Sequence, residues 1–449
     1  MTGPTPKRRG IARIASFVTG VAVMGLLAAG VIVLAAGLNA REPLVDRLPP
    51  PTPEDARYAR VFLLTMEHIG RQPDREGTLI GTAEDFNGLF RILGRGRDDI
   101  RLRADMEDGR LLLAMSAQVP GMERLGWINV SAAVPPYSGR MRLQRLRVAG
   151  IPVPAGPAVR ALAWAADSHF GEGAGTQALG MLPRLVVDDE DLTFDIAMPA
   201  GADRLLSRNA IAEIYGREMV SRAEVAAAAT FLEGEVAAGR LQRSGSYAPW
   251  LSAIIAHAAE APAEKSADAV MAGFMALNYL CGSDHFVSVL LPPSMGERVA
   301  MPDARPGCGR AGLRGRVDLR RHFTTAAAIK LISNRSAAVT AGEAKELYDM
   351  LHDGFDFTDV AANNSGIRLA MLLDSADPEE MRALAARIKS EDDVIIDLDG
   401  IPQIMDRGNF REQFGEVDSP AYLAMIAEIE ARIDRLPIHS GGSGGGQEG

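Results

Sequence analysis

A histidine followed by acidic and amide residues is the part of this chain whose side chains could do chemistry. His322 lies in the segment 316–333, where apolar residues recur at helical spacing and place its ring on a buried face. Three further candidates follow within the segment 342–366: Glu346, Asp359 and Asn363. An imidazole beside carboxylates can bind a divalent cation, or it can accept and donate protons near neutral pH.

Three uses of these residues remain open. In a metal site, His322 and Glu346 would be joined by Asp349 or Asp359, although this spacing matches no known zinc motif. In an acid–base site, the same side chains would exchange protons with a substrate. In a purely structural network they would hold helices together, and Asp318, one turn before His322, would accept a hydrogen bond from the imidazole. The sequence assigns no metal and no cofactor.

Local signals give several neighbouring polar residues a structural role. Thr340 and Glu343 match a capping box, so Glu343 is expected at the N-terminus of a helix. Gly354 is expected to end that helix, and Asp356 or Thr358 is expected to begin the next one.

The order of these motifs resembles that of known envelope proteins. The chain reads HF, then GEAKELYD, then FDFTDVAANNSG. This order is similar to the pattern H…E…D-x3-N-x2-G of VanZ-like and YfiM-like proteins. Carried over by position, the pattern falls on His322, Glu346 or Glu343, Asp359, Asn363 and Gly366. The resemblance implies a place in the bacterial envelope but no common reaction, and this region lacks the membrane-spanning run of VanZ-like proteins.

The clearest signal for location is near the N-terminus, where residues 16–38 run without a charged side chain. At a rise of about 1.5 Å per residue this run crosses a bilayer, so the sequence predicts one transmembrane helix over 15–38. Lys and Arg in the tail 1–14 predict that this tail is cytoplasmic and that the remainder is exported. We therefore expect a single-pass protein of the bacterial inner membrane with its bulk in the periplasm. A cleaved signal peptide is the alternative.

The exported part divides into two regions of different pattern. After a Pro-rich linker at 39–55, residues 56–203 alternate strand and turn signals with helical patterns, which predicts an α+β domain with helices on one face of an antiparallel sheet. Residues 204–437 are predicted to be mainly α-helical, with one short strand at 394–398. The Gly-rich tail 438–449 is predicted to be disordered.

Within these regions, turn and cap residues locate individual elements. The turns EDG at 107–109 and DDED at 188–191 predict two hairpins, and helices are predicted over 83–94 and 155–170. Four residues are expected to cap helices: Ser221, Ser266, Asp377 and Ser419. The segments AEDFNGLF, ADMEDGRLLLAM and RLRVAGIPVPAGPAVRAL loosely resemble DUF2140-type membrane-anchored modules of the lipid-transfer kind, and that resemblance brings no catalytic residues.

The chain has two cysteines, Cys281 and Cys308. In an oxidising compartment, a pair separated by a short loop with Pro and Gly predicts a disulfide. Two unrelated thiols are the alternative. A cysteine-rich metal site is excluded because no third thiol exists.

Eleven Arg residues between positions 90 and 150 make the α+β region locally basic. A domain held near a membrane would meet anionic lipid or envelope glycan through such a face. The residues expected there are Arg101, Arg103, Arg142, Arg145 and Arg147. A merely solvated face is the alternative. The net charge of −10 argues against a general nucleic-acid binder.

Taken from the sequence alone, the leading expectation is a non-enzymatic accessory or scaffold protein of the envelope, which binds a lipid, glycan or protein partner. The alternative is an envelope hydrolase or metal-dependent enzyme that uses His322 and the carboxylates of the segment 343–359.

Overall fold

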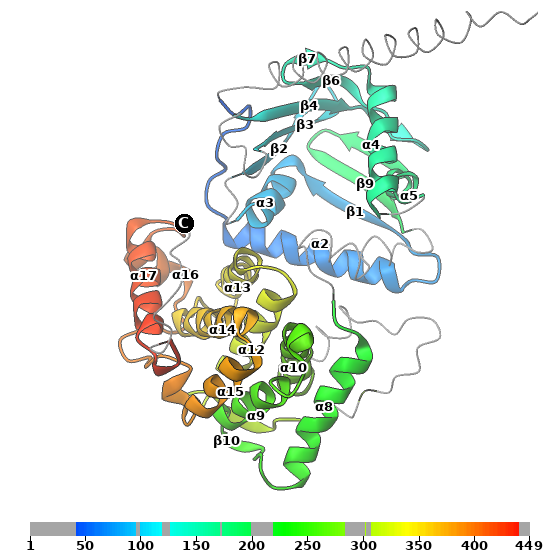
Figure 1. Ribbon diagram of the computed structural model, residues 1–449. Helices are drawn as coiled ribbons and strands as arrows, with labels where there is room; N and C mark the ends of the chain where they lie inside the picture. The colour runs from blue at the N-terminus through cyan, green and yellow to red at the C-terminus, as the bar shows by residue number, and fades with distance from the viewer. Residues whose placement is uncertain are drawn as a thin grey trace, which may run out of the picture.

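The computed structural model describes residues 42–95, 99–118, 126–170, 173–198, 219–282, 301 and 307–439. It has an α+β part with antiparallel sheets and a helical C-terminal part (Figure 1). The predicted transmembrane helix and the Gly-rich tail lie outside the described residues. Within the described ranges, no helix is both long enough and apolar enough to cross a membrane.

The larger sheet of the α+β part is antiparallel, with strand order β2-β3-β4-β6-β7. Its strands are β2 (Ile100–Glu107), β3 (Arg110–Ala117), β4 (Ile128–Val134), β6 (Gln144–Val148) and β7 (Ile151–Pro152). The predicted EDG hairpin joins β2 to β3. Asp108 and Gly109 have φ values of 52° and 66° there, as a tight turn between twisted strands requires.

A second antiparallel sheet has the order β1-β9-β8-β5, whereas the sequence predicted only one. Its strands are β1 (Glu76–Thr82), β5 (Tyr137–Ser138), β8 (Arg184–Asp188) and β9 (Asp191–Ala197), and the predicted DDED hairpin joins β8 to β9. The two sheets share one core, in which Ala104 and Leu111 of the larger sheet meet Leu185 and Leu192 of the smaller one. The helices of this part are α2 (Pro53–Arg71), α3 (Ala83–Leu93), α4 (Ala155–Phe170) and α5 (Ala174–Gly180).

The helical part is built around α12 and α14, which pack on one another with α10 and α13 beside them (Figure 1). Its helices are α8 (Arg222–Ala237), α9 (Ala248–Ala258), α10 (Ser266–Cys281), α12 (Val317–Ile332), α13 (Arg335–Asp349), α14 (Phe357–Ser375), α15 (Pro378–Arg387), α16 (Arg407–Phe414) and α17 (Pro420–Asp434). The short strands β10 (Ser244–Ser246) and β11 (Arg310–Gly312) pair in parallel, which the sequence did not predict.

Three of the four predicted caps are confirmed. Ser221, Asp377 and Ser419 each accept a hydrogen bond from the first turn of the helix that follows. The prediction for Ser266 is wrong, because it lies inside α10 and its hydroxyl donates to the carbonyl oxygen of Ala263, one turn earlier.

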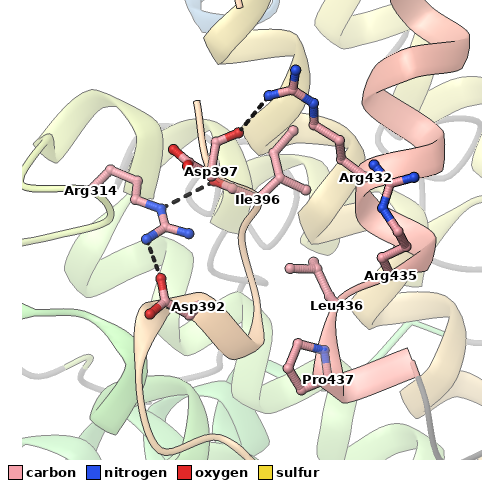
Figure 2. Close-up of a pocket in the computed structure, with 8 residues that line it drawn as sticks. All are labelled: Arg314, Asp392, Ile396, Asp397, Arg432, Arg435, Leu436 and Pro437. Atoms are coloured by element: carbon pink, nitrogen blue, oxygen red, sulfur yellow. Dashed lines mark hydrogen bonds and ion pairs between the residues drawn. The ribbon is translucent and has the colours of Figure 1, made fainter. Parts of the chain in front are cut away.

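The predicted strand at 394–398 is also wrong, and two arginines explain why. The guanidinium of Arg314 donates to the carbonyl oxygens of Ile395 (2.7 Å) and Ile396 (3.1 Å). Arg432 donates to the carbonyl oxygen of Asp397 (3.2 Å), as Figure 2 shows at the rim of a pocket of about 440 Å³. Side chains therefore satisfy the acceptors that a neighbouring strand would otherwise bind.

Cys281 and Cys308 form the disulfide that the sequence predicts, with Cα atoms 5.0 Å apart. Both residues are buried in the core of the helical part. The bond joins the end of α10 to the segment before β11 and closes a separation of 27 residues. Chain-entropy reasoning gives a loop of that length a stabilisation of about 3 kcal/mol.

The two parts meet at a set of side chains that we name the Arg95 junction: Arg95, Glu343, Asp418 and Tyr422. The guanidinium of Arg95, just after α3, donates to Glu343 Oε1 (2.7 Å) and to Asp418 Oδ1 (2.8 Å). The hydroxyl of Tyr422 donates to Glu343 Oε1 at 2.6 Å. Glu343 thus binds a partner 248 residues away in the chain.

The capping box predicted for Glu343 is therefore wrong. Helix α13 begins two turns earlier, at Arg335, and Asn334 is its N-cap. The Thr340 hydroxyl donates to the carbonyl oxygen of Arg95 instead (3.1 Å), so both members of the predicted box contact the other part of the molecule.

Candidate functional site

Three helices bring the predicted site residues together. His322 comes from α12, Glu346 from α13, and Asp359 and Asn363 from α14. Asp356 is the N-cap of α14, because its side chain accepts a hydrogen bond from the Thr358 backbone N–H (2.8 Å). Asp359 therefore lies in the first turn of α14, and Asn363 lies one turn later on the same side.

Glycines let these helices approach closely. A Cβ atom on Gly366 of α14 would lie 2.2 Å from the carbonyl oxygen of Phe323 on α12. A Cβ atom on Gly342 of α13 would lie 2.7 Å from Asn363 Nδ2. Both distances are far below a van der Waals contact. A larger residue at Gly366 would push α12 and α14 apart, because it would meet backbone, whereas one at Gly342 would displace the Asn363 side chain.

Replacing Gly366 by Ala is expected to cost about 3 kcal/mol in the free energy of unfolding, because the new methyl group collides with rigid backbone. Urea unfolding of the purified protein measures this cost. The matched control is Gly234→Ala in α8, where nothing lies within 4 Å and alanine is expected to stabilise the helix by up to about 1 kcal/mol. Equal effects of the two changes would show that α12 and α14 are not in backbone contact.

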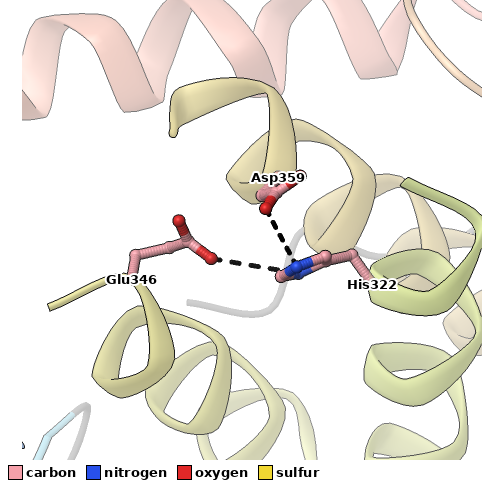
Figure 3. Close-up of side chains that lie close together, drawn as sticks. All are labelled: His322, Glu346 and Asp359. Atoms are coloured by element: carbon pink, nitrogen blue, oxygen red, sulfur yellow. Dashed lines mark ion pairs between the residues drawn. The ribbon is translucent and has the colours of Figure 1, made fainter. Parts of the chain in front are cut away.

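The imidazole of His322 is 8% exposed and lies between two carboxylates. Its Nε2 atom is 2.9 Å from Asp359 Oδ2, and its Nδ1 atom is 3.9 Å from Glu346 Oε1. Figure 3 shows both carboxylates directed at the ring. Nδ1 also lies 3.2 Å from Asn363 Oδ1. Each ring nitrogen thus faces an oxygen acceptor.

Asp318 does not take the role that the sequence suggested. Its carboxylate pairs with Arg316 at 2.5 Å, and His322 pairs with Asp359 instead. Burial raises the pKa of Asp318, but the hydrogen bond and charge of Arg316 outweigh burial and hold that pKa below its usual value. Arg316 also contacts Asp356 (3.1 Å) and Asp359 (3.3 Å), so one guanidinium joins three carboxylates at the start of α12 and α14.

Glu346 is 1% exposed, and burial is the main reason that its pKa rises to about 7. The nearby Asp359 carboxylate raises this pKa further, whereas Lys345 and His322 lower it. The Lys345 ammonium lies 3.2 Å from Glu346 Oε1, 2.6 Å from Asp349 Oδ2 and 3.7 Å from Asp359 Oδ2. Burial opposes the charge of Lys345, but these carboxylates outweigh it and raise the lysine pKa. The ammonium therefore stays charged.

Glu346 makes stability depend on pH. The folded protein holds the Glu346 proton more tightly than the unfolded chain does. The protonated carboxyl therefore contributes to the free energy of unfolding; this contribution is fully present below about pH 4.5 and is lost as pH rises through about 7. Between about pH 4.5 and 7, the free energy of unfolding of the wild type is expected to fall by about 3 kcal/mol more than that of Glu346→Gln.

Urea unfolding at several pH values between 5 and 8 measures this difference. The control is Glu412→Gln, an exposed glutamate of α16, which should keep the wild-type slope. Parallel curves for the wild type and Glu346→Gln would contradict the raised pKa of Glu346.

A cavity of about 270 Å³ opens beside the imidazole. Its polar wall consists of Arg321, His322, Thr325, Lys345 and Asn363, and its apolar wall consists of Ala326, Ile329, Ala338, Ala341 and Gly342. Asn363 is 5% exposed, and its Nδ2 atom has no hydrogen-bond partner among the described residues. An unpaired buried N–H group costs about 1–3 kcal/mol, so a ligand with an acceptor atom would gain a hydrogen bond there.

Three of the same side chains could also serve as metal ligands. His322, Glu346 and Asp359 each offer one ligand atom, and these atoms lie within 4.8 Å of one another. One imidazole and two carboxylates would suit Zn²⁺ or a similar ion. However, the Lys345 ammonium already pairs with both carboxylates, 3.2 Å from Glu346 Oε1 and 3.7 Å from Asp359 Oδ2. A metal ion would first have to displace it, so the donor set fits an ion poorly in this arrangement.

No family model, curated protein or solved structure matches the chain. The resemblances to VanZ-like, YfiM-like and DUF2140-type proteins therefore stay predictions from the quoted motifs.

The structure brings together His322, Glu346, Asp359 and Asn363. It places the predicted arginines in two groups, on β2 and at β6, with two strands of the larger sheet between them. Arg101 stacks on the Trp127 ring, with 4.5 Å between the guanidinium carbon and the ring centre, and Arg103 pairs with Asp105 at 2.7 Å. Arg142, Arg145 and Arg147 are exposed.

Sequence reasoning missed Lys345, which lines the cavity and neutralises the cluster. The sequence places Lys345 directly before Glu346, which could have indicated it. However, adjacent residues on a helix point about 100° apart, so the two side chains were not expected in one site.

Proposed function

We propose that this protein is a membrane-anchored hydrolase of the bacterial envelope that acts through the His322 site. One observation carries the proposal: the imidazole of His322 is oriented by Asp359 at Nε2 and lines a cavity. With its proton on Nε2, the ring has an unprotonated Nδ1, which can act as a general base toward water once the Asn363 amide moves aside from it. The anchor is the helix predicted over 15–38, which would export the site to the periplasm.

The neighbouring residues support a hydrolytic cycle. His322 Nδ1 takes a proton from water while the water oxygen bonds to the substrate carbonyl or phosphoryl centre. Asp359 and Asn363 Oδ1 then accept hydrogen bonds from the imidazolium. The Lys345 ammonium and Asn363 Nδ2 would stabilise the negative charge that develops on the attacked oxygen. The imidazolium returns the proton to the leaving group as that bond breaks, which restores the neutral ring.

The non-enzymatic accessory protein remains the second candidate, and one observation favours it. Lys345 and Arg316 already pair with the carboxylates around His322, so the cluster is held without a ligand, as in a structural network between helices. In that case the partner would be a lipid, glycan or protein bound elsewhere on the molecule.

Hydrolysis of activated esters separates the two candidates. The full chain in detergent is incubated with p-nitrophenyl acetate, a carboxylic ester, and with bis(p-nitrophenyl) phosphate, a phosphodiester, and nitrophenolate release is followed. We expect turnover of at least one, lowered about 10²–10⁴-fold by His322→Ala. His352→Ala, which removes an exposed histidine beyond α13, is the matched control and should keep the wild-type rate. Equal rates for wild type and His322→Ala on both esters would exclude the hydrolase and leave the accessory protein.

A further inference from the structure

One long stretch of this acidic protein contains no acidic residue. Residues 124–166, which are 43 positions, include six Arg and no Asp or Glu, although the whole chain has a net charge of −10. In the fold, most of this stretch forms β4, β6, β7 and the first turns of α4. Helix α4 packs next to β6, so arginines that are close in the sequence also lie close together in the fold, and they form a basic surface.

Large apolar side chains are exposed on the same elements. Trp164 of α4 is 71% exposed and Ile151 of β7 is 56% exposed. Arg160 is exposed as well and lies one helical turn before Trp164, on the same face of α4. An exposed Trp beside arginines is typical of residues that lie at the boundary between lipid headgroups and acyl chains.

The segment that precedes α2 lies against this same sheet. The amide of Asn129, on β4, donates to the carbonyl oxygen of Glu42 (3.1 Å) and accepts from the Leu44 N–H (2.9 Å). The 41 residues before Glu42 include the predicted membrane helix. The predicted anchor would thus join the folded protein at the sheet that carries the basic surface, and the helical part lies at the other end of the molecule (Figure 1).

We propose that the β6–β7 hairpin and the exposed face of α4 dock on a bilayer that contains anionic phospholipid. Arg142, Arg145 and Arg147 contact the lipid phosphates, since guanidinium groups bind phosphate well. Ile151 and Trp164 enter the interfacial layer. The inference rests on the membrane anchor of the proposed function but not on its chemistry, and docking would fix the height and orientation of the His322 site above the membrane.

Tryptophan fluorescence tests the docking because the other two tryptophans are buried: Trp127 is 7% exposed and Trp250 is 0% exposed. The full chain is reconstituted into vesicles of phosphatidylcholine with brominated acyl chains, with or without phosphatidylglycerol. The Trp164 signal is the difference between wild type and Trp164→Phe. We expect the vesicles with phosphatidylglycerol to quench most of that signal, phosphatidylcholine alone to quench little, and high salt to relieve the quenching.

Charge variants identify the surface. Arg142→Gln with Arg145→Gln should abolish the dependence on phosphatidylglycerol, whereas Arg310→Gln with Arg411→Gln, two exposed arginines of the helical part, should not. Co-flotation of the protein with vesicles but no quenching of Trp164, or equal quenching with both lipid mixtures, would overturn the docking and point to a glycan or protein partner instead. Failure of the chain to float at all would overturn the anchor itself, whereas ester hydrolysis is an independent readout of the His322 site.

Discussion

Replacing Asp359 by Asn is expected to lower kcat for ester hydrolysis about 10²–10⁴-fold while KM changes little. The carboxylate of Asp359 lies 2.9 Å from His322 Nε2 and fixes the proton on that nitrogen, so Nδ1 is left as the base. An amide at this position can donate to Nε2 instead, which moves the ring proton to Nδ1 and removes the base. It also removes the negative charge that stabilises the imidazolium formed during the reaction.

Steady-state kinetics on the better ester of the two measures this effect. The matched control is Asp349→Asn, which removes a carboxylate bound to Lys345 at 2.6 Å and makes no contact with the ring. Circular dichroism and the melting temperature check that both variants remain folded. If Asp359→Asn lowers kcat no more than Asp349→Asn does, then Asp359 does not orient the imidazole and the proposed base is wrong.

Replacing Arg95 by Ala is expected to destabilise the protein by about 3–5 kcal/mol, the largest stability effect that we predict. The guanidinium binds Glu343, whose side chain is 7% exposed, and removing it leaves this carboxylate buried without its cation. Asp418 loses the same partner, and the Tyr422 hydroxyl alone still donates to Glu343. Because the junction joins two parts of the chain, its loss should also loosen their contact.

Urea unfolding followed by circular dichroism measures the cost. Another ion pair between the two parts supplies the control: Arg407 binds Glu54 at 2.6 Å, and both side chains are about half exposed. Arg407→Ala should therefore cost less than about 1 kcal/mol, because solvent screens an exposed pair. Similar costs for the two variants would mean that the Arg95 junction is no more buried in solution than the pair at the surface.

Local signals in the sequence predicted much of the secondary structure. The EDG and DDED turns, the helices over 83–94 and 155–170, and the caps at Ser221, Asp377 and Ser419 depend on residues close in the chain, and the structure contains each of them. Two of the failures share a cause. The strand at 394–398 and the capping box at Glu343 were overridden by arginines from distant segments, Arg314, Arg432 and Arg95, whose side chains bind the polar groups concerned.

The candidate site, too, was predicted where local spacing decides and missed where packing decides. The helical spacing around His322 indicated a buried ring, and the structure places Glu346, Asp359 and Asn363 beside that ring. The choice between Asp318 and Asp359 as partner of the imidazole could not be made, because it depends on where Arg316 directs its charge once α12 and α14 are packed. The cavity also depends on packing, since it requires the close approach of α13 to α14 at Gly342.

Chemical rescue tests the central claim most directly. His322→Gly removes the imidazole and leaves a space beside Asp359, so free imidazole added to this variant can take the place of the ring. We predict that ester hydrolysis is lost in His322→Gly and returns in a saturable manner as imidazole is added, above the rate that imidazole gives without protein. Full activity of His322→Gly without imidazole would contradict the assignment of His322 as the base.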